Sequence, residues 1–157
     1  MPLVLAHVLP QEQRGARSQL KGRSVLDFVQ TIFGIFLIAH GLVHAILAAA
    51  PRPDIPDAKP LTFWTRQSKL LPGVGESITR PVAMVLWVVS TLLFVAAGLG
   101  VLGVPGLRDI WSGLTAAGAI TSLLLLLLFW HRWLIVGLLI DLGLLLLIVV
   151  FNWTPVN

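Results

Sequence analysis

The stretch that decides the fold runs from Val25 to Ala50 and reads VLDFVQTIFGIFLIAHGLVHAILAAA. It is longer than the roughly 20 apolar residues that an α-helix needs to cross a bilayer. Two histidines, His40 and His44, lie four residues apart inside it. Ionisable side chains are costly at membrane depth, and by default they indicate a functional site with a nearby polar partner. The stretch therefore predicts a transmembrane helix that carries part of a site.

The composition extends this prediction to the whole chain. Of its 157 residues, 57% are hydrophobic and 11% are charged, whereas about 25% are charged in an ordinary soluble domain. The mean hydropathy is +0.91. These values indicate an all-α integral membrane protein.

Three more apolar stretches are long enough to span a bilayer, so we expect a four-helix bundle. The expected spans are residues 25–50, 82–103, 110–130 and 133–153, with a long interfacial loop at 51–81. Residues 1–24 are expected to form a cytoplasmic or interfacial segment before this single transmembrane domain, 25–157. Four of the six tryptophans fall at the ends of these spans, where indole rings prefer the boundary between lipid and water.

Charge and missing motifs exclude several classes of protein. The isoelectric point of about 10.8 does not indicate nucleic-acid binding, because all eleven basic residues lie outside the apolar spans, where lipid headgroups are the expected partner. The absence of cysteine excludes disulfides and thiolate metal sites. No Walker loop, dinucleotide fingerprint, nucleophile elbow or H-E-x-x-H helix occurs. We expect a bacterial inner-membrane protein with both termini in the cytoplasm, because a dense basic cluster precedes the first span.

Helical periodicity divides the first span into two faces. At 100 degrees per residue, the face expected to contact protein carries Asp27, Gln30, Gly34, Leu37, His40, Gly41, His44 and Ala48. The opposite face is apolar and is expected to contact lipid. The small residues Gly34, Gly41 and Ala48, spaced by seven, should let a neighbouring helix approach closely.

A rise of about 1.5 Å per residue predicts a polar layer shared by the four helices. The residues expected at this common depth, and therefore the candidate binding residues, are His40, His44, Thr91, Thr121, Ser122 and Asp141. Asp141 cannot lie ionised in lipid, so it should be protonated or paired, and His40 is its expected partner. Hydrogen bonding between helices alone would explain the same layer, at about 0.6 kcal/mol per contact.

The layer leaves the ligand open between a quinone, a haem, a pigment and a metal. An aspartate can fix the tautomer of a ligating imidazole, and an aspartate–histidine pair can pass protons to a quinone. His40 and His44 are the candidate metal ligands, although zinc normally takes three or four. Histidines at i and i+4 of one helix cannot supply both axial ligands of one haem iron. No catalytic residue can be assigned.

The run His40-Gly41-Leu42-Val43-His44 and the later Ile78-Thr79-Arg80-Pro81 resemble a group of small bacterial four-helix membrane proteins. These carry an H-G-[LI]-[IV]-H motif in the first helix, and the resemblance covers roughly residues 33–150. It implies the four-span fold and the place of both histidines, and implies no activity. In architecture and size the chain also resembles, more distantly, the DoxX-like membrane proteins, some of which act beside quinone-linked oxidoreductases.

Three functions follow as hypotheses. The first is an accessory subunit or binding module of a larger membrane complex, with the polar layer as its site. The second is a proton-coupled transporter or a component of a quinone-linked membrane oxidoreductase. The third is a purely structural subunit. The expected partners are the lipid bilayer and either other membrane subunits or further copies of this chain, and not nucleic acid.

Overall fold

The computed structural model describes residues 11–49, 70–130 and 134–155, and these are helical apart from short connections. In chain order, the elements are α1 (Gln11–Ala49), α2 (Glu76–Val101), the short 3₁₀-helix η1 (Arg108–Ile110), α3 (Trp111–Leu128), α4 (Ile135–Leu145) and the π-helical turn η3 (Leu146–Val150). The predicted all-α class is confirmed for this part of the chain. Three segments, Val25–Ile46, Ser77–Val101 and Arg108–Leu128, are long and apolar enough to cross a membrane, and a fourth, Ile135–Val150, is shorter.

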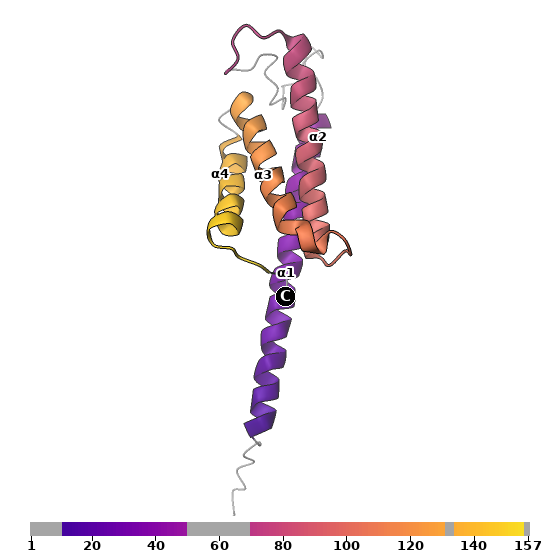
Figure 1. Cartoon of the computed structure of the whole chain (residues 1–157), viewed down its shortest axis with the longest axis vertical. Coiled ribbons are helices and arrows are strands. Elements are labelled where there is room, and N and C mark those ends of the chain that lie inside the picture. The colour runs from indigo at the N-terminus through magenta and orange to yellow at the C-terminus, as the bar shows by residue number, and fades with distance from the viewer. Residues whose placement is uncertain (1–10, 50–69, 131–133, 156–157) are drawn as a thin grey trace, which may run out of the picture.

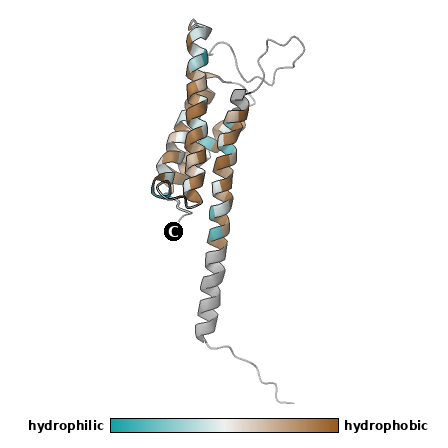
Figure 2. Ribbon diagram, turned by 90° about the vertical axis from the view of Figure 1, so that its right-hand side faces the viewer, coloured by the Kyte–Doolittle hydropathy of each residue, from teal (hydrophilic) through white to brown (hydrophobic). Residues whose placement is uncertain are grey.

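Successive helices run in opposite directions, and α2, α3 and α4 lie beside the C-terminal half of α1 (Figure 1). We call the end where α1 stops at Ala49 and α2 begins at Glu76 the loop end. The opposite end, where residues 102–107 connect α2 to η1, is the turn end. The N-terminal part of α1 extends beyond the other helices at the turn end. Most of the packed helical surface is apolar, with hydrophilic residues meeting near mid-height (Figure 2).

The closest packing occurs between α1 and α2, at glycines. A Cβ atom added at Gly98 would lie 2.6 Å from the carbonyl oxygen of Gly34, and one added at Gly41 would lie 3.0 Å from Phe94 Cβ. The predicted close approach at Gly34 and Gly41 is therefore confirmed. The third small residue, Ala48, falls outside the side chains that the structure describes.

The two predicted faces of α1 are confirmed, with one exception. Gly34, Leu37, His40, Gly41 and His44 are buried, and the apolar residues of the opposite face are exposed. The exception is Asp27, which is exposed. Gln30, three residues after Asp27 in α1, donates a hydrogen bond to the carbonyl of Val101, the last residue of α2 (2.5 Å). Asp27 therefore lies beyond the end of α2. Within residues 11–49, 70–130 and 134–155, no other helix extends to that level to cover Asp27.

Two predicted boundaries were wrong. The helix α2 begins at Glu76, so residues 76–81 belong to it and not to the loop, and Pro81 lies inside it. Helix formation starts before the proline, at Gly75, whose carbonyl accepts hydrogen bonds from the N–H groups of Ile78 and Thr79 (3.0 and 3.2 Å). Pro81 then removes only one backbone hydrogen bond.

The last span also ends earlier than predicted, at Val150 and not at residue 153. The chain leaves η3 through Asn152, which has a φ of 45°. Trp153 then packs edge-to-face against Phe33 of α1, with ring centroids 5.0 Å apart. This contact takes Trp153 out of line with the helix and ties the end of the described chain to α1.

Two apolar clusters enclose the middle of the structure. The larger one lies toward the turn end, draws on all four helices and η3, and comprises Leu37, Phe94, Ala97, Val101, Trp111, Ala119, Leu144 and Ile148. The smaller one lies toward the loop end between α2 and α3 only, and comprises Ala83, Trp87, Leu125 and Phe129. The polar layer lies between these two clusters.

Candidate functional site

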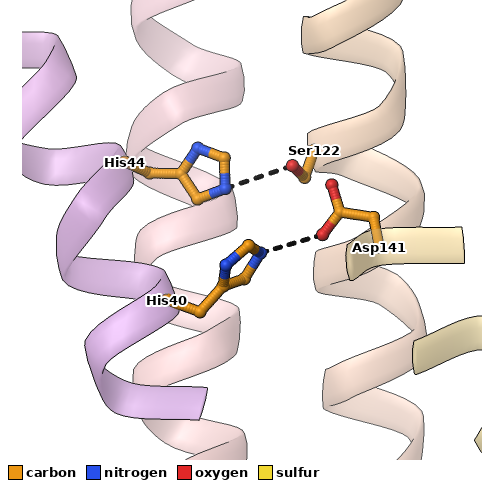
Figure 3. A network of polar contacts seen from close by, with 4 residues as sticks. All are labelled: His40, His44, Ser122 and Asp141. Carbon is orange, nitrogen blue, oxygen red and sulfur yellow. Dashed lines mark hydrogen bonds and ion pairs between the residues drawn. The ribbon is translucent and has the colours of Figure 1, made fainter. Parts of the chain in front are cut away.

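The centre of the layer is a hydrogen bond between α1 and α4. His40 Nε2 lies 2.9 Å from Asp141 Oδ1, and the two side chains are 8% and 0% exposed (Figure 3). If the carboxyl group is ionised, the imidazole N–H donates; if it is protonated, its O–H donates to the ring nitrogen. This is the partnership predicted from depth alone.

A second hydrogen bond runs beside the first and joins α1 to α3. His44 Nε2 lies 3.1 Å from Ser122 Oγ, and both residues are buried. Figure 3 shows the two bonds crossing between the helices one above the other. The imidazole rings have centroids 5.3 Å apart and are nearly perpendicular. His44 and Ser122, both expected in the layer, are thus hydrogen-bonded to each other.

Helix α2 contributes an aromatic wall to the site. The ring of Phe94 lies edge-on to His40 at 4.7 Å and parallel to His44 at 6.1 Å, measured between centroids. Gly41 and Gly118 make room for this ring, since added Cβ atoms would lie 3.0 and 3.4 Å from Phe94. On its other side, His40 stacks with Phe36 at 6.0 Å. The orientation of both imidazoles is therefore constrained by packing as well as by hydrogen bonds.

Two predicted members of the layer do not join this network. The hydroxyl of Thr121 donates to the carbonyl of Ala117 in its own helix (2.8 Å) and lies on the exposed side. Thr91 is partly buried as a residue and its carbonyl faces Gly41, but its buried hydroxyl oxygen has no hydrogen-bond partner among the described residues. His131, a further histidine whose side chain could supply a zinc ligand, lies outside the described residues.

The sequence interpretation missed Ser90 and Phe94, both fully buried on α2. A signal for them exists in the pattern Ala83, Trp87, Ser90, Phe94, Ala97, which repeats at spacings of four and three and marks one helix face. Thr91 lies one residue, or about 100 degrees, away from that face.

Four buried polar atoms at this depth have no hydrogen-bond partner within the described part of the chain. They are Asp141 Oδ2, His44 Nδ1, Ser90 Oγ and Thr91 Oγ1. A buried polar group without a partner costs about 1–3 kcal/mol. Such atoms are therefore candidates for contact with a ligand or for proton transfer.

The geometry does not favour a metal or a haem iron. Among the described residues, no group of three or more His, Cys, Asp or Glu side chains is arranged to hold a metal ion. The Nε2 atoms of His40 and His44 already contact Asp141 and Ser122. The site is instead suited to hydrogen bonding and to proton exchange.

Comparison with family models, curated proteins and solved structures gave no match. The site must therefore be interpreted from its own chemistry. An imidazole and a carboxyl group can each bind and release a proton, and their N–H groups and oxygen atoms can bind carbonyl and hydroxyl groups.

Proposed function

We propose that this protein is a multi-pass protein of the bacterial inner membrane and that its four helices form a transmembrane bundle. We further propose that it acts as an accessory subunit or binding module of a larger membrane complex. The observation that carries this proposal is the buried hydrogen bond between His40 and Asp141. The resemblance of the sequence to small membrane proteins with the H-G-[LI]-[IV]-H motif supports the same topology.

The distribution of ionisable residues argues for a site in addition to helix packing. Helices α2, α3 and α4 together contain only three such residues: Glu76 and Arg80 at the loop end, and Asp141. Asp141 nevertheless lies beside the two histidines of α1. Serine or asparagine would join helices without the cost of desolvating an ionisable group. The meeting of all three mid-depth ionisable groups is therefore better explained by a role for them.

A quinone is the ligand class that these residues support best. Its carbonyl oxygens accept hydrogen bonds, and its reduced form donates them. His44 Nδ1 and Asp141 Oδ2 are the matching protein atoms. Both Nε2 atoms already have partners, and His44 Nδ1 alone would offer a metal ion a single ligand, whereas a zinc site normally takes three or four.

Extraction of the protein purified from its native membrane tests this function. Organic extracts of the wild type should contain a quinone in a fixed ratio to protein, and the amount should fall sharply in His40→Ala. Thr121→Ala is the matched control, because its hydroxyl bonds only to its own helix. A quinone-free wild type, or equal quinone in all three proteins, would contradict the proposal. Absorption spectra and metal analysis of the same samples test the haem, pigment and metal alternatives.

The two alternative functions differ from this one in what the site does. In a proton-coupled transporter or a quinone-linked oxidoreductase component, Asp141→Asn should abolish the pH dependence of transport or redox activity, and a pH dependence that survives this substitution would exclude that function. In a purely structural subunit, substitutions of His40 and Asp141 lower stability and change neither bound ligand nor activity. Partners in each case are lipids and other membrane subunits or a second copy of this chain.

A further inference from the structure

We propose that the layer binds an internal water molecule between Asp141 Oδ2 and Ser122 Oγ, and that this water joins the two hydrogen bonds of the site into one network. The inference goes beyond the proposed function, because it concerns the protein without a quinone. Where a quinone binds, its oxygen atom would replace this water beside Asp141.

The packing of α3 against α4 places Ser122 opposite Asp141. One turn toward the loop end, a Cβ atom added at Gly137 of α4 would lie 3.4 Å from Leu126 Cδ1 of α3. The two helices run in opposite directions. Four residues back from Leu126 is Ser122, and four residues forward from Gly137 is Asp141, so both side chains move one turn along the same seam.

Each of the two side chains has an unused hydrogen-bonding position directed toward the other. Asp141 bonds His40 through Oδ1, and its Oδ2 atom is buried without a partner. Figure 3 shows this second oxygen on the side of Ser122. The hydroxyl of Ser122 contacts His44 Nε2, and a hydroxyl group has one donor and two acceptor positions. The two oxygens are not bonded to each other, so a bridging molecule can bind to both.

Water fits this position in every protonation state of the site. An ionised Asp141 can only accept at Oδ2, whereas a carboxylic acid with its proton on Oδ2 donates. Ser122 likewise either donates to His44 or accepts from it. A water molecule both donates and accepts, so it complements all of these arrangements. A carbonyl oxygen only accepts, and it therefore fits Oδ2 only when that atom carries the proton.

The position is enclosed by residues that the structure describes. Asp141 and Ser122 are both fully buried. Ala119 and Leu144 pack together on the turn-end side, and Leu126, also buried, lies on the loop-end side. Internal waters typically bind buried polar groups that have no partner within the protein, whereas enclosed apolar sites stay dry. Water at this position would therefore be an ordered part of the structure.

The bridging water connects groups that are otherwise separate. His40 and Asp141 form one hydrogen bond, and His44 and Ser122 form the other. With the water in place, these four side chains form one network across α1, α3 and α4. The effect of removing Asp141 should then depend on whether Ser122 is present, although the two side chains have no direct bond.

A structure of the full-length protein in lipid nanodiscs tests the site directly. The protein is produced in cells that cannot make quinone, and the resolution must show ordered water. We expect a density peak about 2.5–3.0 Å from both Asp141 Oδ2 and Ser122 Oγ. The peak should be lost in Ser122→Ala and retained in Thr121→Ala, whose hydroxyl bonds to its own helix. A direct bond between Asp141 and Ser122, an empty position, or a peak that persists in Ser122→Ala would overturn the inference.

A double-mutant cycle measures the connection in solution. The combined Asp141→Leu and Ser122→Ala variant should unfold with an equilibrium constant roughly threefold to twentyfold smaller than the two single effects predict, the range found for polar contacts between membrane helices. Asp141→Leu combined with Thr121→Ala should be additive. Additivity of Asp141→Leu with Ser122→Ala would overturn the inference, and if Asp141→Leu does not fold, the density experiment decides alone.

Quinone extraction from protein purified from its native membrane separates the two proposals. Water in the quinone-free protein together with a native preparation that lacks quinone refutes the proposed ligand alone. Quinone in the native preparation together with an empty position in the quinone-free protein refutes this inference alone.

Discussion

At the scale of single residues, the contribution of His40 to stability depends on Asp141, and that of Asp141 on His40, because neither side chain is solvated. Their hydrogen bond replaces contacts with water that burial has removed, so its net value is small while the cost of breaking it is larger. Interhelical polar contacts in membranes average about 0.6 kcal/mol and reach about 1.7 kcal/mol. An unpaired buried polar group costs about 1–3 kcal/mol. Removing one partner should therefore lower the free energy of unfolding by more than its share of the effect of removing both.

A double-mutant cycle measures this dependence. We expect His40→Ala and Asp141→Ala to destabilise the protein individually, and the double variant to be more stable than their sum by about 0.6–1.7 kcal/mol. Unfolding by sodium dodecyl sulfate in mixed micelles, followed by circular dichroism, gives the free energies. Asp27→Ala combined with His40→Ala is the control pair, since Asp27 is exposed and distant from the pair. Strict additivity for His40 and Asp141 would show that the bond contributes nothing.

The sequence predicted the partners that had no competitor at their depth. Asp141 is the sole carboxyl group in the last span, and the histidines of the first span are the nearest groups able to pair with it. Adjacent polar residues were harder to assign, because one residue turns the side chain by about 100 degrees. Thr91 was chosen in place of Ser90, and Thr121 was included beside Ser122, for this reason. The place of Phe94 depends on Gly41 and Gly118, which belong to two different helices.

At the scale of elements, the crossing of α1 and α2 positions the histidines. Gly98 contacts the backbone of Gly34, so that even a methyl group has no room there. Since backbone cannot rotate away as a side chain can, an added Cβ must separate the helices. The register of α1 against the other helices therefore depends on this contact.

We expect Gly98→Ala to destabilise the protein by about 1–3 kcal/mol, the usual cost of overpacking. Gly113→Ala in α3 is the matched control, because an added Cβ there meets nothing within 4 Å. That change should be neutral or stabilise by up to about 1 kcal/mol through helix propensity. Both free energies come from the same unfolding experiment in mixed micelles. Equal effects of the two substitutions would mean that the crossing is looser than described.

Helix ends were predicted less well than helix interiors. Hydropathy identifies the apolar segment, but the start of α2 is determined by backbone bonds at Gly75, and the end of η3 by the contact of Trp153 with Phe33. Proline was expected to end the loop at residue 81, yet a helix that has already formed tolerates it near its start. Hydropathy contains neither the local backbone bonds at Gly75 nor the long-range contact of Trp153 with Phe33.

At the scale of the whole molecule, the antiparallel order of the helices gives a definite topology. The connection between α2 and α3 and the segment after η3 lie at the turn end, and the start of α2 lies at the loop end. Our proposal that both termini are cytoplasmic then assigns the turn end to the cytoplasm. The chain has no cysteine, so single cysteines can be introduced without background.

Intact cells in which the outer membrane is permeabilised should show this topology. An impermeant maleimide is expected to label Ser77→Cys from outside, and to label Pro105→Cys and Thr154→Cys only after the inner membrane is opened. These three positions are exposed in the structure. Leu124→Cys, exposed on the apolar surface of α3, should react in neither case. Labelling of all three exposed positions from one side would exclude four spans, and the reverse pattern would invert the orientation.

The shortness of the last helix has a consequence for the lipid around it. With 11 residues in α4 and 5 in η3, its described part extends about 24 Å at 1.5 Å per residue, less than the roughly 30 Å hydrocarbon thickness of a bilayer. In the proposed transmembrane bundle, lipids next to α4 would therefore compress, at a fraction of a kcal/mol for each ångström. The protein should consequently prefer thin regions of membrane, and the indentation brings headgroups and water closest to Asp141 on that flank.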